Sequence, residues 1–192
     1  GLGDVYKRQM LDWGPDSTVF TVTSGDFQKN SLKIFGHAYT DDALLPLREL
    51  FQYTQTLYAY RLNGGGAKAA CAYCTAKYSG IAGNKLYVVI AANADNADLF
   101  DVSLYYDTTL LDTQTVAAAT ALKDNDFVTW KTTASLAATA KTPLTGGTNG
   151  TANAAAHQAA LDKFESYSFN TLGCPSDDST TIKLYINYTK RL

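Results

Sequence analysis

Residues that could carry chemistry are few in this sequence, and a glycine-rich segment is the first candidate. LTGGTNGT, Leu144 to Thr151, places adjacent glycines and hydroxyl side chains ahead of a predicted helix, as phosphate-binding loops do. A Walker loop needs Gly-x-x-x-x-Gly-Lys-Ser/Thr, and a dinucleotide fingerprint needs Gly-x-Gly-x-x-Gly directly after a strand. The segment departs from both patterns. It therefore favours a linker, whose glycines allow positive φ before Thr148, Asn149 or Thr151 caps the helix.

The second candidate is CAYC, in which Cys71 and Cys74 have metal or redox spacing. Zinc would need two further ligands, and the other soft donors, Cys174, His37 and His157, are isolated in sequence. A thioredoxin-type pair would lie at a helix N-terminus after a strand, whereas CAYC lies between a glycine run and KYSG. We expect structural or incidental thiols. The odd number of cysteines, without a secretion signal in the sequence, favours reduced thiols in a cytosolic setting.

The histidines and carboxylates do not suggest catalysis. His157 lies in AAAHQAA with no Gly-x-Ser-x-Gly motif nearby, and a helix-surface position is the better interpretation. His37 follows a predicted helix stop, where a polar residue is common. The carboxylates are mostly aspartates in turns and caps, and nothing pairs them in sequence as acid and base. We therefore expect no catalytic residue, no cofactor and no metal.

Composition is typical of a globular protein with an unusual share of aromatic residues. The chain has 192 residues, of which 46% are hydrophobic and 18% charged, and its net charge of −2 gives no basic footprint for nucleic acid. The longest apolar run, Leu86 to Ala92, is far shorter than the ~20 residues of a membrane span. Thirteen tyrosines, eight phenylalanines and two tryptophans exceed what one core needs, and tyrosine suits interfaces. The residues alone thus favour a non-enzymatic α/β assembly protein.

The elements that would position these residues begin with a β-α-α-β pattern. A strand is predicted at 17–23, a helix capped by Ser24 and stopped by Gly36 follows, and TLYAYRL at 56–62 is the next strand. A second helix, capped by Thr40 or Asp41, lies between them.

The middle of the chain is β-rich, whereas its flanks alternate helix and strand. From Leu86 to Leu122 it contains five aspartates and no Lys, Arg or Glu. The predicted elements are a strand at 85–93, a hairpin at 100–116 with its turn at 107–109, a short helix at 117–123 and a strand from Asp126.

The α/β pattern is expected to return after the glycine-rich segment. We predict a helix at 151–167, a short buried strand ending at Pro175, and a last helix capped by Asp177 or Asp178. That last helix would carry Ile182, Tyr185, Ile186 and Thr189 on one face.

Several segments, in order, resemble one family, the tail sheath proteins of contractile bacteriophages and prophage-derived particles, in the version common in Firmicutes phages. The resemblance covers nearly everything from Leu11 to Leu192. The segments are LDWGP, FQKNSLKIFGHAYTDDALLPLRELFQYTQTLYAYRLNGGGAKA, TAKYSGIAGNKLYVVI, LKDNDFVTW, TPLTGGTNG and ALDKFESYSFNTLGCP.

The resemblance implies a discontinuous α/β core, often called subtilisin-like, with an inserted β-rich domain of sandwich or barrel type. The expected division is a core at 10–75 and 145–192 and an insertion at 76–144. TPLTGGTNG would mark re-entry into the core, which makes a hinge of Thr145, Gly146, Gly147, Thr148, Asn149 and Gly150. The subtilisin-like label carries no protease chemistry, because no Asp, His and Ser motif is present to receive it.

Family membership implies a structural subunit of the virion tail, assembled in the bacterial host cytoplasm. Its copies would form hexameric rings stacked helically around the tail tube protein, and would contract to drive the tube through the host envelope. Baseplate and tail terminator proteins would be further partners, with no direct nucleic acid and no small-molecule substrate. We expect the basic residues Lys183, Lys190 and Arg191 to face a neighbouring subunit, and the acidic stretch from Asp95 to Asp112 to be a solvated outer face.

The ends of the chain carry their own expectations. GLGDVYKRQ, residues 1–9, resembles the translated read-through of a sequencing adapter, so we exclude it from the fold and expect it to be disordered. The absence of an initiator Met and the stop at KRL suggest an internal fragment, with the core truncated at its C-terminal side.

Two other classes of function remain open at this stage. One is a small-ligand or nucleotide-binding α/β enzyme that uses the loop at 145–151. The other is a carbohydrate-binding β module with exposed Tyr105, Tyr106 and Trp130.

Overall fold

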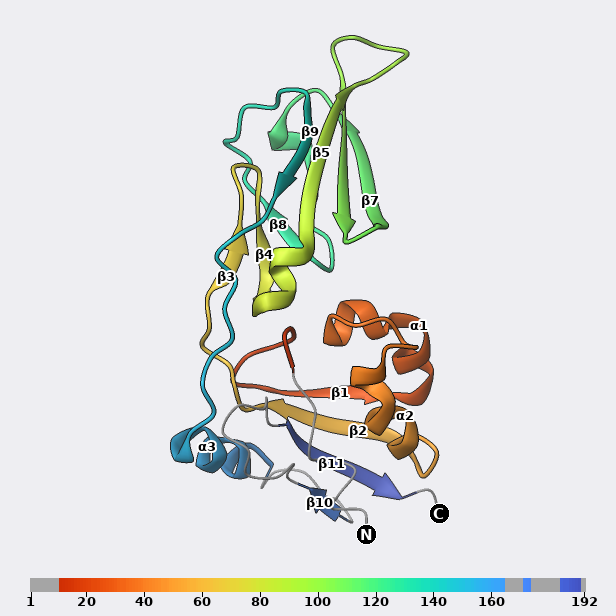
Figure 1. Cartoon of the computed structure of the whole chain (residues 1–192), viewed down its shortest axis with the longest axis vertical. Helices are drawn as coiled ribbons and strands as arrows, with labels where there is room; N and C mark the ends of the chain where they lie inside the picture. The colour runs from red at the N-terminus through yellow and green to blue at the C-terminus, as the bar shows by residue number, and fades with distance from the viewer. Residues whose placement is uncertain (1–10, 165–170, 174–183, 191–192) are drawn as a thin grey trace. The chain divides into compact units, whose positions relative to one another are not determined.

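The computed structural model describes residues 11–164, 171–173 and 184–190. The chain divides into two compact units, which Figure 1 shows. The first unit runs up to Gly66 and resumes at Asn149, and the second spans Ala67–Thr148. These boundaries differ from the expected ones, which followed residues 75 and 144.

The first unit is built on a four-stranded sheet with the order β1-β2-β11-β10, in which neighbouring strands are antiparallel. The strands are β1 (Val19–Thr23), β2 (Thr54–Arg61), β10 (Thr171–Gly173) and β11 (Leu184–Lys190). The helices are α1 (Ser24–Phe35), α2 (Leu45–Leu50) and α3 (Ala154–Phe164).

Both faces of this sheet are covered by helices (Figure 1). Alternate residues of β2 point to opposite faces, so Leu57 and Ala59 join the core under α1 and α2, while Tyr60 packs with Ala160 and Phe164 of α3. The first unit is therefore a helix–sheet–helix layer structure, which agrees with the mixed α/β content expected.

Local signals set the helix ends. Thr23, and not the expected Ser24, caps α1, because its side chain accepts a hydrogen bond from the backbone of Asp26. Gly36 ends α1 in the left-handed conformation with φ of 73°, as predicted. Asp41 caps the 3₁₀ turn Asp42–Leu44 that leads into α2, which confirms one of the two proposed caps.

The predicted last helix is wrong. The structure has the strand β11 there, which pairs with β2 on one side and with β10 on the other. LYINYTK fits a helical face at Tyr185, Ile186 and Thr189, but it also alternates with a period of two and is rich in aromatic and β-branched residues. Pairing with a strand more than a hundred residues away decides between the two patterns.

The second unit contains two antiparallel sheets, one with the order β3-β4-β8 and one with the order β7-β6-β5-β9. The strands of the first are β3 (Lys68–Ala70), β4 (Cys74–Ser79) and β8 (Val128–Trp130). Those of the second are β5 (Leu86–Ala92), β6 (Phe100–Tyr106), β7 (Thr109–Val116) and β9 (Thr139–Pro143).

Alternation creates the core of the second unit. In β5 the buried residues are Leu86, Val88 and Ile90, and in β6 Val102 and Leu104 are buried, with half-buried or exposed residues between them. The β6–β7 hairpin was predicted, whereas β3, β4 and β9 were not, and the expected helix at 117–123 is only the 3₁₀ turn Ala119–Ala121. In the part of the chain that the structure describes, no helix is both long and apolar enough to cross a membrane.

Candidate functional site

The two segments that connect the units are tied to each other, within each unit, by hydrogen bonds that backbone amides donate. In the first unit, the amide of Gly150 donates to the carbonyl of Asn63 at 3.0 Å. In the second, the amide of Thr148 donates to the carbonyl of Ala67 at 3.1 Å, and the Ala67 amide donates to Thr148 Oγ1 at 2.9 Å. The segment that leaves the first unit, at residues 63–67, is thus paired with the segment that returns to it, at residues 148–150, on both sides of the boundary.

This bonding leaves little of the loop for a phosphate. The amide of Thr145 donates to the carbonyl of Ala70 at 3.0 Å, that of Gly147 to Asn84 Oδ1 at 2.8 Å, and those of Thr148 and Gly150 as above. A phosphate cradle needs such amides to point at the ligand. The geometry therefore argues against the nucleotide-binding alternative.

The glycines of the loop also do not lead directly into a helix. α3 begins at Ala154, and Asn153 caps it by accepting the amide of Ala156 at 2.9 Å. The expectation that Thr148, Asn149 or Thr151 would be the cap is therefore wrong.

Close packing requires two of the glycines, and positive φ requires another. A Cβ at Gly147 would overlap the carbonyl oxygen of Gly80, and one at Gly150 would overlap that of Gly64. Gly146 has open space around it but a φ of 84°, a backbone conformation that residues other than glycine rarely adopt.

Side chains that the sequence analysis did not single out anchor these segments. Arg61 is buried and donates to the carbonyl of Gly14 at 3.0 Å and to Asp16 Oδ1 at 3.3 Å, while Asn63 donates to the carbonyl of Leu11 at 3.0 Å. They hold the irregular segment 11–16 against the end of β2. The only sequence signal was a charged residue and an asparagine directly before a glycine run.

The cysteine pair lies in the second unit, at the tip of the hairpin formed by β3 and β4. The Sγ atoms of Cys71 and Cys74 are 3.8 Å apart, with Cys71 half-buried and Cys74 buried. Cys174 lies outside the described residues. Across the described ranges, no group of three or more His, Cys, Asp or Glu side chains could hold a metal ion.

His37 has charged partners that its sequence position did not reveal. Its Nδ1 lies 3.0 Å from Asp41 Oδ2 and its Nε2 lies 3.5 Å from Asp12 Oδ2. Hydrogen bonding to Asp12, and then to Asp41, raises the pKa of His37 above its ordinary value, and burial opposes the rise. His157 lies in α3, as expected from its alanine-rich surroundings.

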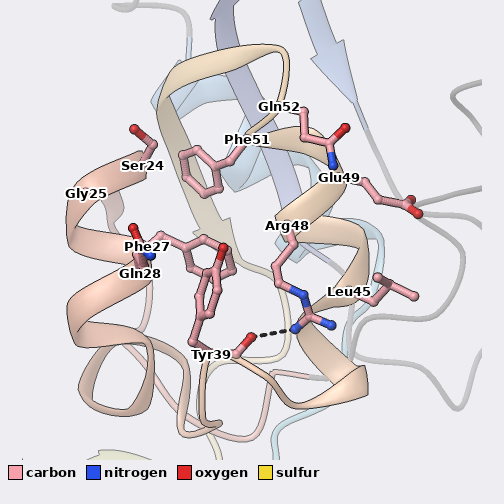
Figure 2. A pocket seen from close by; sticks show the side chains of 10 residues that line it. All are labelled: Ser24, Gly25, Phe27, Gln28, Tyr39, Leu45, Arg48, Glu49, Phe51 and Gln52. Atoms are coloured by element: carbon pink, nitrogen blue, oxygen red, sulfur yellow. Dashed lines mark hydrogen bonds between the residues drawn. The ribbon is translucent and has the colours of Figure 1, made fainter.

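A cavity of about 510 Å³ lies between α1 and α2 (Figure 2). Its wall contains the stacked rings of Phe27 and Phe51, with centroids 4.9 Å apart, and Tyr39. Arg48 is held there by hydrogen bonds to the carbonyls of Tyr39 and Asp41, so its charge is already engaged by the protein. The lining supplies no acid–base or nucleophilic pair for catalysis.

The residues named for glycan binding are mostly buried. Tyr106 is 6% exposed and Trp130 is 4% exposed, which contradicts the expectation of exposed rings. Tyr105 is half-buried and stacks on Tyr87 at 5.0 Å between ring centroids. The carbohydrate-binding alternative therefore loses two of its three residues.

The charged residues expected at surfaces are only partly described. Asp95, Asp98 and Asp107 are exposed, whereas Asp101 and Asp112 are half-buried and accept hydrogen bonds from neighbouring side chains. Lys190 is the last residue of β11, and Lys183 and Arg191 lie outside the described residues.

Comparison with known proteins gives this arrangement a class. The profile of the phage tail sheath protein beta-sandwich domain matches residues 64–149, and that of the N-terminal region of domain III of the tail sheath protein Gp18 matches residues 9–62. The first match coincides closely with the second structural unit.

Individual relatives agree. The Bacillus subtilis (strain 168) phage-like element PBSX protein XkdK is 34% identical over 159 residues, which take in 78% of this chain and 32% of XkdK. The uncharacterized protein YqbK of the same strain is 31% identical over an alignment of 219 residues, gaps included, which covers 99% of this chain and 45% of YqbK.

Solved structures agree as well. The crystal structure of the sheath tail protein from Desulfitobacterium hafniense has a TM-score of 0.79 and 34% identity, covering 91% of this chain and 43% of that one. The sheath tail protein from Listeria innocua gives a TM-score of 0.71 and 28% identity, over 84% of this chain and 38% of the other.

The chain belongs to the phage tail sheath protein family, which is a structural family and not one of enzymes. It has the family's β-sandwich domain together with mixed α/β content. It spans less than half the length of the relatives and structures that it matches.

Proposed function

We propose that this chain is part of a subunit of a contractile tail sheath. Copies of the complete subunit polymerise as stacked hexameric rings around the tail tube protein in the virion tail, after assembly in the host cytoplasm. Contraction then drives the tube through the host cell envelope. The observation that carries the proposal is that two sheath profiles match consecutive segments, 9–62 and 64–149, which correspond to separate structural units.

The layout of the subunit forms part of the proposal. The first unit is the discontinuous subtilisin-like core, and the second unit is a β-domain inserted into it. The pairing of the outgoing and returning segments supports an insertion, because both connections lie side by side where the chain leaves the core and returns. An insertion joined in this way can be carried by the core without disturbing its sheet.

The hinge is proposed at the glycine-rich segment Thr145, Gly146, Gly147, Thr148, Asn149 and Gly150, together with the outgoing run Gly64–Gly66. The bond from Gly150 to Asn63 lies on one side of the connection, residues 64–66 and 149, and the bonds between Thr148 and Ala67 lie on the other, so they bracket it. Rotation is easiest in the backbone between these brackets, where Gly65 has φ of 82° and open space around it. Small residues at such a position absorb dihedral changes at low cost.

The mechanism needs no cofactor, small-molecule substrate or direct nucleic acid contact. Subunits locked in an extended form have poorer contacts than in the contracted form, and baseplate triggering releases the difference through rigid-body movement at interfaces. A tail terminator would cap the other end. Lys183, Lys190 and Arg191 are proposed to face a neighbouring subunit, and Asp95, Asp98 and Asp107 the solvent.

The test is expression of the complete gene, followed by electron microscopy. Tubular polysheaths are the expected product, because sheath subunits contact one another through broad surfaces. A complete protein that stays monomeric at high concentration would contradict the proposal.

The hinge has a separate test in this chain. Spin labels at Thr21→Cys and Thr109→Cys, one in each unit, should give a broad distance distribution when the native cysteines are replaced by serine. Labels at Lys68→Cys and Thr109→Cys, both in the second unit, serve as the control and should give a narrow distribution. Equally narrow distributions for the two pairs would remove the hinge.

A further inference from the structure

The tip of the β3–β4 hairpin holds two thiols in unequal surroundings. Cys71 directly follows the last residue of β3 and is half-buried, while Cys74 is the first residue of β4 and is buried. Only Ala72, which is exposed, and Tyr73 separate them. A small reagent can therefore approach Cys71 but not Cys74.

Three groups favour a thiolate at Cys71. The thiol of Cys74 lies at 3.8 Å, the amide of Tyr73 donates to Cys71 Sγ at 3.4 Å, and Lys131 lies close enough to bond the carbonyl of Cys71 at 2.6 Å. The hydrogen bond from Cys74 is the main reason that the pKa of Cys71 is lowered to about 6. The same hydrogen bond, together with burial, raises the pKa of Cys74 above its usual range.

The arrangement also lets the two sulfur atoms join. A disulfide needs the sulfur atoms at about 2.05 Å, so the pair must close by less than 2 Å, which side-chain rotation at a two-residue turn can supply. The hairpin itself is fixed, because the amide of Cys71 bonds the carbonyl of Cys74 and that of Lys131 bonds the carbonyl of Tyr73.

We propose that Cys71 and Cys74 form a reversible dithiol–disulfide site, whose substrate is a small-molecule disulfide. Cys71 is the attacking thiol and Cys74 the resolving thiol. This site is independent of sheath assembly, so its test does not depend on the function proposed above.

The reaction balances in two steps. The Cys71 thiolate attacks one sulfur of R–S–S–R, which breaks that S–S bond, forms a mixed disulfide and releases RS⁻, which takes a proton from water. Cys74 then gives its proton to solvent and attacks Cys71 Sγ, forming the intramolecular disulfide and releasing a second RS⁻. The protein loses two electrons and R–S–S–R is reduced to two thiols.

The experiment uses the full chain with Cys174→Ser, so that only this pair is counted. The reduced protein is mixed with oxidised glutathione at pH 6, quenched with acid at intervals, and followed by intact mass and thiol counting. Both thiols should disappear together without a lasting glutathione adduct. The initial rate should be about tenfold faster than for the same chain unfolded in urea, since more thiolate outweighs its lower nucleophilicity.

Matched variants assign the roles. Cys74→Ala should stop at a stable glutathione adduct on Cys71, and Cys74→Ser is the alternative should the alanine variant not fold. Cys71→Ala should leave Cys74 largely unreacted until the chain is unfolded. A wild-type pair that keeps its thiols, accumulates the adduct, or reacts no faster than the unfolded chain would overturn the proposal.

Discussion

The two units keep charge in different places. In the first, Arg61 is fully buried at the end of β2, beside Asp16 and the carbonyl of Gly14. In the second, the ion pairs Lys77–Asp126 and Lys85–Asp107 are exposed and long, at 4.0 and 3.9 Å. In the first unit a buried charged side chain holds neighbouring backbone in place, whereas in the second unit these paired charges are exposed to solvent.

The difference follows from what each unit must hold. The segment 11–16 forms no strand or helix, so side chains such as Arg61, Asn63 and Trp13 must bond to backbone to fix it. The second unit is held by strand ladders, whose backbone bonds need no particular side chain. Loss of one buried side chain should therefore damage the first unit most, and crowding of the backbone should damage the second.

One tryptophan in each unit makes the comparison measurable. Trp13 is buried in the first unit and Trp130 in the second. Trp130→Phe gives a chain whose fluorescence follows the first unit, and Trp13→Phe gives one that follows the second. Urea unfolding in these two backgrounds reports the free energy of unfolding of each unit separately.

The largest effect is expected from Gly147→Ala. The new Cβ would overlap the carbonyl oxygen of Gly80 and lie 3.0 Å from Asn84 Oδ1, and backbone cannot move aside as a flexible side chain can. The free energy of unfolding of the second unit should fall by about 3 kcal/mol, the upper range for overpacking.

Gly25→Ala is the matched control for that substitution. Nothing lies within 4 Å of a Cβ at Gly25, which is in α1, so alanine should be neutral or stabilise the first unit by up to about 1 kcal/mol. Equal effects of the two substitutions would show that the glycine-rich segment is not closely packed.

Arg61→Met is expected to be next. It keeps most of the side-chain volume but removes the bonds to the Gly14 carbonyl and to Asp16. Each bond to a charged group contributes about 1.5–3 kcal/mol, but removal of the buried charge also removes its desolvation cost, so the net fall in the free energy of unfolding of the first unit should be about 2–3 kcal/mol.

Lys85→Met is the counterpart in the second unit. Its partner Asp107 is 3.9 Å away and both side chains are exposed, so the change should be under about 0.5 kcal/mol. If Lys85→Met cost as much as Arg61→Met, the contrast between buried and surface charge would fail.

Local signals in the sequence predicted much of the fold. The Gly36 stop, the Asp41 cap, β1, β2 and the β6–β7 hairpin were recovered because each is determined by neighbouring residues. The last helix was wrong because the identity of β11 depends on β2, far away in sequence. The short strands β3 and β9 were missed for a different reason, since three to five residues carry too little periodic pattern.

The candidate site was less predictable than the fold. The glycine-rich segment could be recognised as a linker from its departures from phosphate-binding motifs. The hydrogen bonds of buried Arg61 could not be predicted, because its acceptors on Gly14 and Asp16 lie more than forty residues earlier. Likewise, the spacing of CAYC was visible, but the unequal burial of the thiols depends on β8 packing beside β4.

A smaller, pH-dependent contribution is expected from His37 in the first unit. The pKa of His37 is raised in the folded chain, chiefly by the hydrogen bond to Asp12. The imidazole therefore binds its proton more tightly in the folded state than in the unfolded state, and protonation stabilises the fold. The stabilisation is fully present below the unfolded pKa of about 6.5 and is lost as the pH rises through the folded pKa. Unfolding of the Trp130→Phe chain between pH 5 and 8 should show this loss.

His37→Gln is the control for that profile. Glutamine can still hydrogen bond but cannot be protonated, so the difference from the parent should be largest at the acidic end of the range. A difference that stays constant with pH would mean that His37 acts only through packing or neutral hydrogen bonds.

The smallest effect is expected at the acidic loop of the second unit. Asp98 is exposed, and its contribution to the local turn is the hydrogen bond from its backbone amide to Asn96 Oδ1, so Asp98→Lys leaves that turn intact. The free energy of unfolding of the second unit should change by less than about 0.5 kcal/mol, as at ordinary surface positions. In the complete protein, Asp98→Lys should also leave polysheath formation intact, because a solvated face contributes no subunit contact. A folded Asp98→Lys chain that fails to polymerise would instead place this loop at an interface, and surface charge in the second unit would then serve assembly.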